Sequence, residues 1–310
     1  IYTFTGSTTE PFMRNRLGLC LLHPVDQLAG RACDLRRPDG SIESSKFPLE
    51  ISPDQPFLNL GGISHSLDSG QKVTVEFAGE IFETEDHRNW SDASYKTYCT
   101  PISLPFPAKV EPGDLLKQSI KVSLSGNGEI STNDYQKDST IISVSDKPIP
   151  LPEVGLNIQS GSENLNLSEY LGFETLGINH LRLNLNVSNS NESDIAQALA
   201  IVQKLEIDLD VALTAESPEQ VRDFIDSLGH LKNEIRTIFI FSSKDKTTPV
   251  EFIKAGQESG TGDVEIAGGT DLYFTELNRN PESAKYVEGV NFSINPQVHA
   301  ELLSQLKSEL

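Results

Sequence analysis

Residues 146–152 read DKPIPLP, and this short run separates two parts of the chain that differ in character. Its three prolines stand at alternate positions, which excludes a helix or a central strand because proline lacks the backbone N–H that both need. We therefore predict an interdomain linker at residues 148–153. It joins a first domain over residues 1–147 to a second over residues 154–310, and 310 residues suit about two domains.

The first part has the pattern of an all-β domain. Short runs that alternate apolar and polar residues are separated by Gly, Pro, Asp and Asn turns, and no long helical period occurs. The clearest runs are residues 17–22, 72–77, 116–124 and 140–144. Such strands bury their apolar faces well in two packed sheets, so we predict an antiparallel β-sandwich over residues 1–147.

In the second part, short β runs alternate with amphipathic helices, which predicts a parallel sheet. The expected strands are residues 154–159, 180–186, 209–214, 236–241, 264–267 and 289–294. The expected helices include residues 192–205, 218–228 and 296–310. A TIM barrel has eight βα units, so six predict a (β/α) TIM-type barrel that is incomplete. Because an incomplete barrel exposes strand edges, we expect the natural protein to continue past Leu310.

An open doubly wound sheet is the alternative for the second part. No Gly-rich loop of the dinucleotide or P-loop type follows an expected strand, which argues against a nucleotide-binding version. No HxH or HExxH spacing occurs, and the three cysteines (Cys20, Cys33 and Cys99) show no CxxC pattern. We therefore expect no cofactor and no metal site.

Acidic residues dominate the composition: 45 Asp and Glu against 25 Lys and Arg give a net charge of −20. A nucleic-acid backbone or an anionic membrane would repel such a surface, so we predict neither as a partner. No apolar run approaches the roughly 20 residues that span a bilayer. The cysteine usage favours a cytoplasm, although a start at Ile1 leaves secretion open. The oligomeric state also stays open.

In (β/α) barrels the functional residues lie at the carboxyl ends of the strands. The densest polar group of this kind follows the fifth expected strand, where Glu276, Asn278 and Arg279 stand within four residues. A carboxylate there can act as a general base or nucleophile, and an amide and a guanidinium can hold hydroxyls or an oxyanion. The structural alternative is an ion pair between Glu276 and Arg279.

Four further polar residues lie in the second expected strand or shortly after the sixth. His180 and Arg182 alternate with leucines, so the strand periodicity places both on one face. They are candidates for catalysis, with an internal salt-bridge layer as the alternative, because polar groups in a barrel interior need partners. Asn295 and His299 follow the sixth strand and are candidates for binding hydroxyls. For His299 the alternative is an ordinary residue at a helix start.

A second polar group lies in the first domain, at residues 83–99. It contains the single tryptophan, Trp90, and its pattern is that of neither a normal strand nor a turn. An aromatic ring can stack on a sugar while Arg88, Asn89 and Asp92 bind hydroxyls. The alternative is a polar network that braces a domain interface. The two are compatible if the site lies between domains, where pockets tend to form.

Long runs in both domains resemble the D-apionate lactonase family. The runs are residues 18–24, 51–57, 83–98, 268–279 and 292–299. Thr84 and His87 depart from the pattern, where we expect an apolar residue and Gln. The resemblance implies a sandwich, a TIM barrel and a further C-terminal β-region. It also implies a carboxylic-ester hydrolase that opens a branched sugar lactone, D-apionolactone, to its acid during D-apiose catabolism.

The resemblance assigns no residue roles, so the mechanism is our own hypothesis. Glu276 activates a water molecule or attacks the lactone directly. Arg279, Arg182 or His180 stabilises the tetrahedral oxyanion. The remaining candidates named above bind the hydroxyls or close the site.

Two other functions stay open. A glycoside hydrolase needs a second carboxylate beside Glu276, for which Glu216, Asp271 and Glu85 are candidates. The fourth expected strand ends in Ser-Ser-Lys at residues 242–244, without the acid/base residue common in barrel glycosidases. The non-enzyme alternative is a carbohydrate-binding protein.

Overall fold

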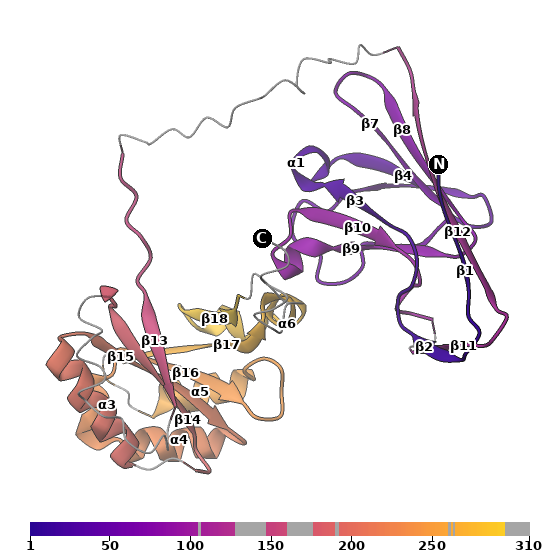
Figure 1. Cartoon of the computed structure of the whole chain (residues 1–310). Helices are drawn as coiled ribbons and strands as arrows, with labels where there is room; N and C mark the ends of the chain where they lie inside the picture. Colours follow the sequence, from indigo (N-terminus) through magenta and orange to yellow (C-terminus); the bar gives the residue numbers. More distant parts are fainter. Residues whose placement is uncertain are drawn as a thin grey trace. The chain divides into compact units, whose positions relative to one another are not determined.

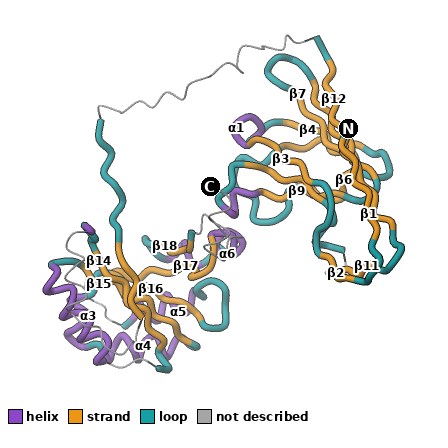
Figure 2. The backbone as a smooth tube through the Cα atoms, in the orientation of Figure 1, coloured by secondary structure: helices purple, strands orange, loops and turns teal. Residues whose placement is uncertain are grey.

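The computed structural model describes residues 1–104, 107–127, 147–159, 176–189, 192–259, 262 and 264–294 (Figure 1). The chain divides into two compact units, Ile1–Ser143 and Val144–Leu310. Strands dominate the first unit, whereas strands and helices alternate in the second (Figure 2). Within the described part, no helix has the length and apolar character needed to cross a membrane.

The first unit is built from antiparallel strands. Their bounds are β1 Tyr2–Ser7, β2 Phe12–Arg14, β3 Cys20–Pro24, β4 Ala32–Arg36, β5 Ile42–Lys46, β6 Phe57–Leu60, β7 Gly62–Ser66, β8 Lys72–Ala78, β9 Phe82–Asp86, β10 Ser94–Tyr98, β11 Ala108–Val110 and β12 Leu115–Ser125. A six-stranded sheet has the order β1-β12-β8-β7-β4-β5, and a four-stranded sheet has the order β3-β10-β9-β6. Strands β2 and β11 pair separately, and a short helix, α1 (Val25–Leu28), follows β3.

One apolar core joins the two larger sheets. Leu35, Ile63 and Phe77 come from the six-stranded sheet, while Leu60 and Phe82 come from the four-stranded sheet. The rings of Phe77 and Phe82 stack with their centroids 4.5 Å apart. The predicted antiparallel sheets are therefore confirmed, and they share a core as the layers of a sandwich do.

The second unit is a parallel six-stranded sheet whose strands follow chain order. Its strands are β13 Gly155–Gln159, β14 His180–Asn186, β15 Asp208–Ala215, β16 Thr237–Ser242, β17 Glu265–Tyr273 and β18 Val290–Ser293. Its helices are α3 Glu192–Leu205, α4 Pro218–Ser227, α5 Val250–Glu258 and α6 Phe274–Arg279, with 3-10 turns at Gly229–Glu234 and Ser283–Tyr286. The predicted parallel sheet is confirmed, and a curled sheet of this order fits a TIM-type domain.

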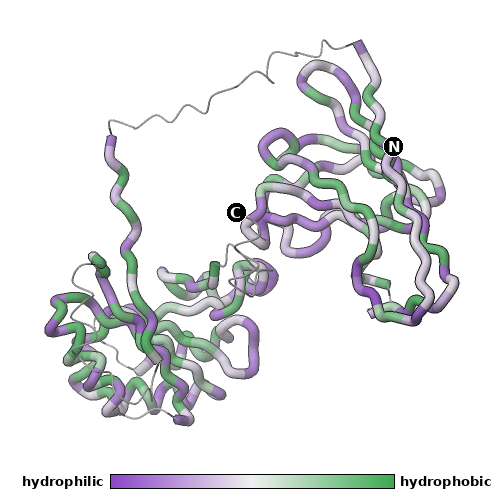
Figure 3. Tube along the Cα trace, in the orientation of Figure 1, coloured by the Kyte–Doolittle hydropathy of each residue, from purple (hydrophilic) through white to green (hydrophobic). Residues whose placement is uncertain are grey.

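The two faces of this parallel sheet differ in polarity. Leu183, Val211 and Ile240 lie in the apolar core together with Ile195 of α3 and Ile253 of α5, so α3, α4 and α5 cover this face. Figure 3 shows the hydrophobic colouring along these strands. Because successive strand residues point to opposite faces, the polar residues between the leucines lie on the other face. That face corresponds to the interior of a barrel.

Helix α4 begins where the sequence predicts it. Ser217 is the N-cap, its hydroxyl accepts a hydrogen bond from the Gln220 N–H at 3.4 Å, and Pro218 takes the first helical position. The helix ends at Ser227, one residue before the predicted end.

Two predicted strand boundaries are wrong, and each for a local reason. The run at residues 17–22 enters the sheet only at Cys20, because the Leu19 N–H donates to the Gln118 side chain at 2.9 Å instead of to the backbone of a paired strand. Strand β17 continues to Tyr273 instead of ending at Ala267. Gly269 permits this: its φ is 129°, and a Cβ there would lie 2.3 Å from the Asn291 carbonyl oxygen.

The description of residues 83–99 as neither strand nor turn is also wrong. The segment forms β9, a 3-10 turn at His87–Trp90 and β10, which pair as antiparallel neighbours. The alternation of apolar and polar residues typical of a strand is absent here, because several charged residues of the segment are buried with charged or polar partners. The expected strand at residues 140–144 and the helix at residues 296–310 lie outside the described residues.

Candidate active site

A hollow of about 330 Å³ lies on the polar face of the parallel sheet. All six strands contribute to its walls, which are formed by Asn157, Arg182, Asn184, Ala212, Thr214, Phe241, Asp271 and Ser293. Most of these residues stand in the second half of their strands. The hollow therefore opens toward the carboxyl ends of the strands, where barrel enzymes place their active sites.

Arg182 is the cation of this hollow. Its Nη1 donates to Asn291 Oδ1 at 2.8 Å, and its Nε is buried with no hydrogen-bond partner. The guanidinium carbon lies 5.4 Å and 5.5 Å from the ring centroids of Phe239 and Phe241. Burial lowers the pKa of Arg182, although Asp210 and Asp271 oppose this. Among the described residues, no carboxylate lies within ion-pair distance of the guanidinium.

Asn291 fixes the position of Arg182. Its Oδ1 accepts from Arg182, while its Nδ2 donates to the backbone carbonyl of Thr270 at 2.6 Å. The amide thus links β14, β17 and β18 through two hydrogen bonds. Because both ends of the amide are engaged, Arg182 is held in one orientation.

Asp271 is the carboxylate of the hollow. Its backbone carbonyl accepts from the Ser293 hydroxyl at 2.7 Å, which joins β17 to β18. Within the described residues, its carboxylate makes no hydrogen bond and no ion pair, and the residue is exposed. A free carboxylate and an underpaired guanidinium therefore line one cavity, and this arrangement supports acid–base chemistry on a polar substrate.

His180 lies on the same strand as Arg182, two residues before it. It is the first residue of β14, and its Nε2 is 3.7 Å from Asp210 Oδ2. Arg236 also binds Asp210, through Nε at 2.9 Å and Nη2 at 2.7 Å. The strand periodicity places His180 and Arg182 on one face as predicted, but His180 is not among the residues lining the hollow. Its contacts are those of a salt-bridge layer at the amino ends of the strands.

Glu276, Asn278 and Arg279 lie on α6, which starts directly after β17. The Glu276 carboxylate is 3.0 Å from Lys246 Nζ and 3.9 Å from Arg279 Nη1, and 15% of its side chain is exposed. The three residues do not line the hollow. Asn295 and His299 lie outside the described residues.

In the first unit, Arg88 and Asn89 bind other parts of that unit. Arg88 pairs with the buried Asp86 at 2.7 Å and donates to the carbonyls of residues 48–50. Asn89 Nδ2 donates to the Ser52 carbonyl at 2.6 Å. These bonds attach the turn between β9 and β10 to the segment before β6, so both side chains have structural partners.

Trp90 and Asp92 belong to a charged cluster around Glu85. Trp90 Nε1 donates to Glu85 Oε1 at 3.1 Å, and Arg16 lies 3.2 Å from Glu85 Oε2. His87 lies 3.6 Å from Glu85 and 3.5 Å from Asp92. Burial alone would raise the pKa of Glu85, but the bonds from His87 and Trp90 and the charge of Arg16 outweigh it and lower the pKa to about 2.

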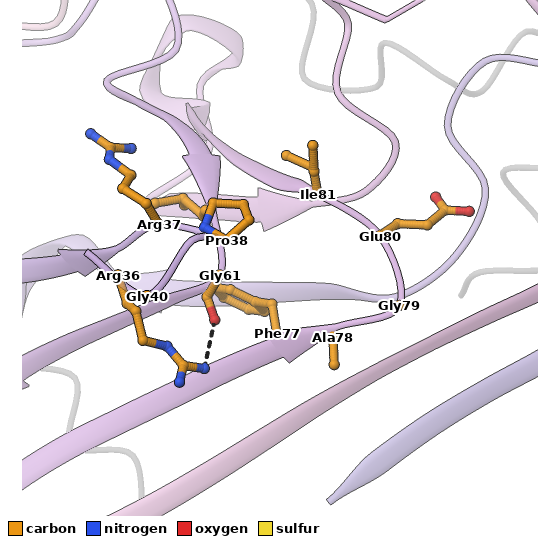
Figure 4. A pocket seen from close by; sticks show the side chains of 11 residues that line it. Arg36, Arg37, Pro38, Gly40, Gly61, Phe77, Ala78, Gly79, Glu80 and Ile81 are labelled. Atoms are coloured by element: carbon orange, nitrogen blue, oxygen red, sulfur yellow. Dashed lines mark hydrogen bonds between the residues drawn. The ribbon is translucent and has the colours of Figure 1, made fainter. Parts of the chain in front are cut away.

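A hollow of about 380 Å³ in the first unit is a weaker candidate (Figure 4). Arg36 and Arg37 line it and point in different directions. Arg36 donates to the Gly61 carbonyl and pairs with Glu76 at 3.4 Å, and Arg37 pairs with Glu43. Its charged groups are thus already satisfied, unlike Arg182.

The sequence identified Arg182 but not the residues that surround it. Asn157, Thr214, Asn291 and Ser293 were missed, and Asp271 was considered only as a second carboxylate. Each stands on a parallel strand at the position whose side chain faces away from the helices. Polar residues at those alternate positions are the signal that identifies them.

We find no group of three or more His, Cys, Asp or Glu side chains able to hold a metal ion in the part of the chain that the structure describes. The fold and the hollow define a class of protein: a TIM-type (β/α) domain with a polar cavity toward the carboxyl ends of its strands, preceded by an antiparallel β domain.

The chain belongs to the D-apionate lactonase family. Residues 1–127 match the family domain described as "D-apionate lactonase, N-terminal domain", and residues 154–301 match "D-apionate lactonase, TIM barrel domain". The D-apionate lactonase of Brucella anthropi is 26% identical over 317 residues, which cover 95% of this chain and 51% of that protein. The chain therefore spans about half the length of the curated relative it matches. The family named from the sequence is confirmed.

Proposed function

We propose that this protein opens a sugar lactone to its acid and that D-apionolactone is the substrate, within bacterial, cytoplasmic D-apiose catabolism. The observation that carries the proposal is that Arg182 and Asp271 line the same hollow and that neither has an ion-pair partner among the described residues. The name of the Brucella anthropi relative supports the reaction and the substrate.

Hydrolysis needs a base, an oxyanion site and groups that hold hydroxyls. Asp271 takes a proton from water as the water oxygen bonds to the lactone carbonyl carbon. Arg182 stabilises the oxyanion that develops. The carbon–oxygen bond of the ring then breaks, the ring oxygen takes the proton held by Asp271, and the new carboxylic acid releases its own proton to solvent and becomes the carboxylate. Asn157, Asn184 and Thr214 are placed to bind the hydroxyls.

Glu276 stays the base predicted from the sequence, and Asp271 is the base that the hollow favours. The two assignments make opposite predictions. The test is hydrolysis of D-apionolactone by the intact protein, followed by proton release, for the variants Asp271→Asn and Glu276→Gln. We expect Asp271→Asn to lower kcat by about 10²–10⁴-fold and Glu276→Gln to change it only a few-fold.

Arg182→Gln should lower kcat by about 10²–10³-fold, as loss of an oxyanion donor does. The matched control is Arg222→Gln, which removes an exposed arginine that pairs with Glu258 at 3.2 Å on the helical side. A large loss in Glu276→Gln with Asp271→Asn unaffected would move the base to α6. Unchanged turnover in both Asp271→Asn and Arg182→Gln would refute the hollow as the active site.

The glycoside hydrolase alternative has less support. Such enzymes place two carboxyl groups on either side of the bond that breaks. Among the described residues that line the hollow, Asp271 is the one carboxylate. Cleavage of an aryl glycoside without opening of any lactone would restore this alternative.

A further inference from the structure

The parallel sheet carries two arginines whose surroundings differ. Arg236, at the amino ends of the strands, contacts three carboxylates: Asp210 at 2.7 Å, Asp208 at 3.1 Å and Glu153 at 2.7 Å. Arg182, which lines the hollow, makes one hydrogen bond to a neutral amide. A guanidinium carries five N–H donors, so most donors of Arg182 have no partner among the described residues.

A partly buried cation with no carboxylate within ion-pair distance is unfavourable, because the more distant charges of Asp210 and Asp271 offset only part of its lost hydration. Phe239 and Phe241 compensate only in part, since their centroids lie 5.4 Å and 5.5 Å from the guanidinium carbon. The anion that would complete this site is therefore expected in the hollow. Asn291 holds the guanidinium for it, because the same amide binds both Arg182 and the Thr270 carbonyl.

We propose that the hollow is a receptor for hydroxylated monocarboxylates, whose carboxylate binds Arg182 and whose hydroxyls bind Asn157, Asn184, Thr214 and Ser293. This deepens the proposed function, on which it rests, because a ring-opened sugar acid belongs to that class. The receptor proposal adds that the free sugar acid binds in the hollow without the lactone present and competes with the lactone for the site.

The charges of the hollow also select among anions. Arg182 is the one cation among its described lining residues, and the Asp271 carboxylate lines the same cavity. A single negative charge on the ligand is balanced by Arg182, whereas a second one meets Asp271. Monocarboxylates should therefore bind better than phosphate or phosphorylated sugars. Four neutral polar side chains on the wall favour a ligand with several hydroxyls.

The test is direct binding measured by isothermal titration calorimetry with the intact protein at pH 7. The probes are sodium D-erythronate, its neutral counterpart erythritol, and inorganic phosphate. We expect D-erythronate to bind at least 10-fold more tightly than either of the other two. Arg182→Gln should weaken its binding at least 10-fold, and the exposed-arginine control Arg222→Gln should bind as the natural protein does.

Asn291→Asp provides a second variant that does not depend on losing the guanidinium. It puts a permanent carboxylate where Arg182 now finds an amide oxygen at 2.8 Å, so it should occupy the cation and abolish D-erythronate binding. Far-ultraviolet circular dichroism verifies that each variant is folded. Equal binding by Asn291→Asp and the natural protein overturns the proposal, and so does phosphate binding as tight as that of D-erythronate.

The binding and turnover experiments test the two proposals separately. Lactone opening without binding of D-erythronate would overturn the receptor proposal and leave the proposed function standing. Binding of D-erythronate that needs Arg182, without opening of any lactone, would support the receptor and refute the hydrolase.

Discussion

Glu85 should make the first unit sensitive to acid. Its side chain is 10% exposed and carries a pKa of about 2, against an ordinary value of 4.5. A carboxyl group whose pKa is lower in the folded state than in the unfolded state stabilises the fold at high pH. This stabilisation is complete above about pH 4.5 and is lost as the pH falls toward 2.

The magnitude follows from the same two pKa values. At about 1.4 kcal/mol per pH unit, the gap between 4.5 and about 2 is worth about 3 kcal/mol. Arg16, one of the groups that lower this pKa, is 34% exposed, so solvent screens its contribution. We therefore expect Glu85→Gln to destabilise the unit by about 2 kcal/mol where Glu85 is ionised.

Trp90 makes the assay specific to the first unit, because it is the only tryptophan of the chain and bonds to Glu85. Urea unfolding followed by its fluorescence gives midpoints for the natural protein and Glu85→Gln. The comparison starts at pH 5, above the ordinary pKa of 4.5 for a glutamate. With an m-value of about 2 kcal/mol per molar urea, the midpoints should differ by about 1 M.

The difference between the two proteins should shrink from pH 5 to pH 2, where protonation removes the Glu85 charge from both. Using this difference cancels the effect of other carboxylates on acid unfolding. A midpoint difference that stays constant over this range would refute the electrostatic argument. So would equal midpoints at pH 5.

Two further variants test the amino ends of the parallel strands, and both are followed by urea unfolding with circular dichroism at 222 nm. Arg236→Gln leaves the Asp210 carboxylate, 4% exposed, without its cation, so we expect a loss of about 3 kcal/mol; a loss below about 1 kcal/mol would contradict this. Gly155→Ala puts a Cβ 2.2 Å from His180 Nε2, and the forced shift should reduce stability by about 1–3 kcal/mol; unchanged stability would show that the ring moves freely.

Much of the fold could be predicted because periodicity records which face of an element is buried. The alternation of strands and helices after residue 153 predicts the parallel sheet, and Ser217 with Pro218 predicts the start of α4. The end of β17 could not be predicted in this way. Two adjacent glycines usually end a strand, whereas Gly269 here lets the strand continue beside the Asn291 backbone.

The site was predictable only in part, because a strand pattern gives the face of a residue and not its height along the barrel. Arg182 and His180 share a face, yet Arg182 lines the hollow whereas His180, two residues earlier, contacts Asp210. Glu276 follows the strand closely in sequence, but α6 begins at Phe274 and turns its carboxylate toward Lys246. Asp271, three residues before that helix, still belongs to the strand and lines the hollow.

The run at residues 83–98 carries part of the family resemblance, and its contacts explain its unusual composition. A loop without a partner strand leaves backbone carbonyls that need donors. Arg88 supplies donors to the carbonyls of residues 48–50, and the Asp86 carboxylate, with 0% of its side chain exposed, both pairs with Arg88 and accepts from the Ser52 N–H at 2.9 Å. The charged residues of this run therefore hold the loop before β6 in place. Ligand contact is better sought at Arg182, which uses one donor on Asn291 and has no described partner for the others.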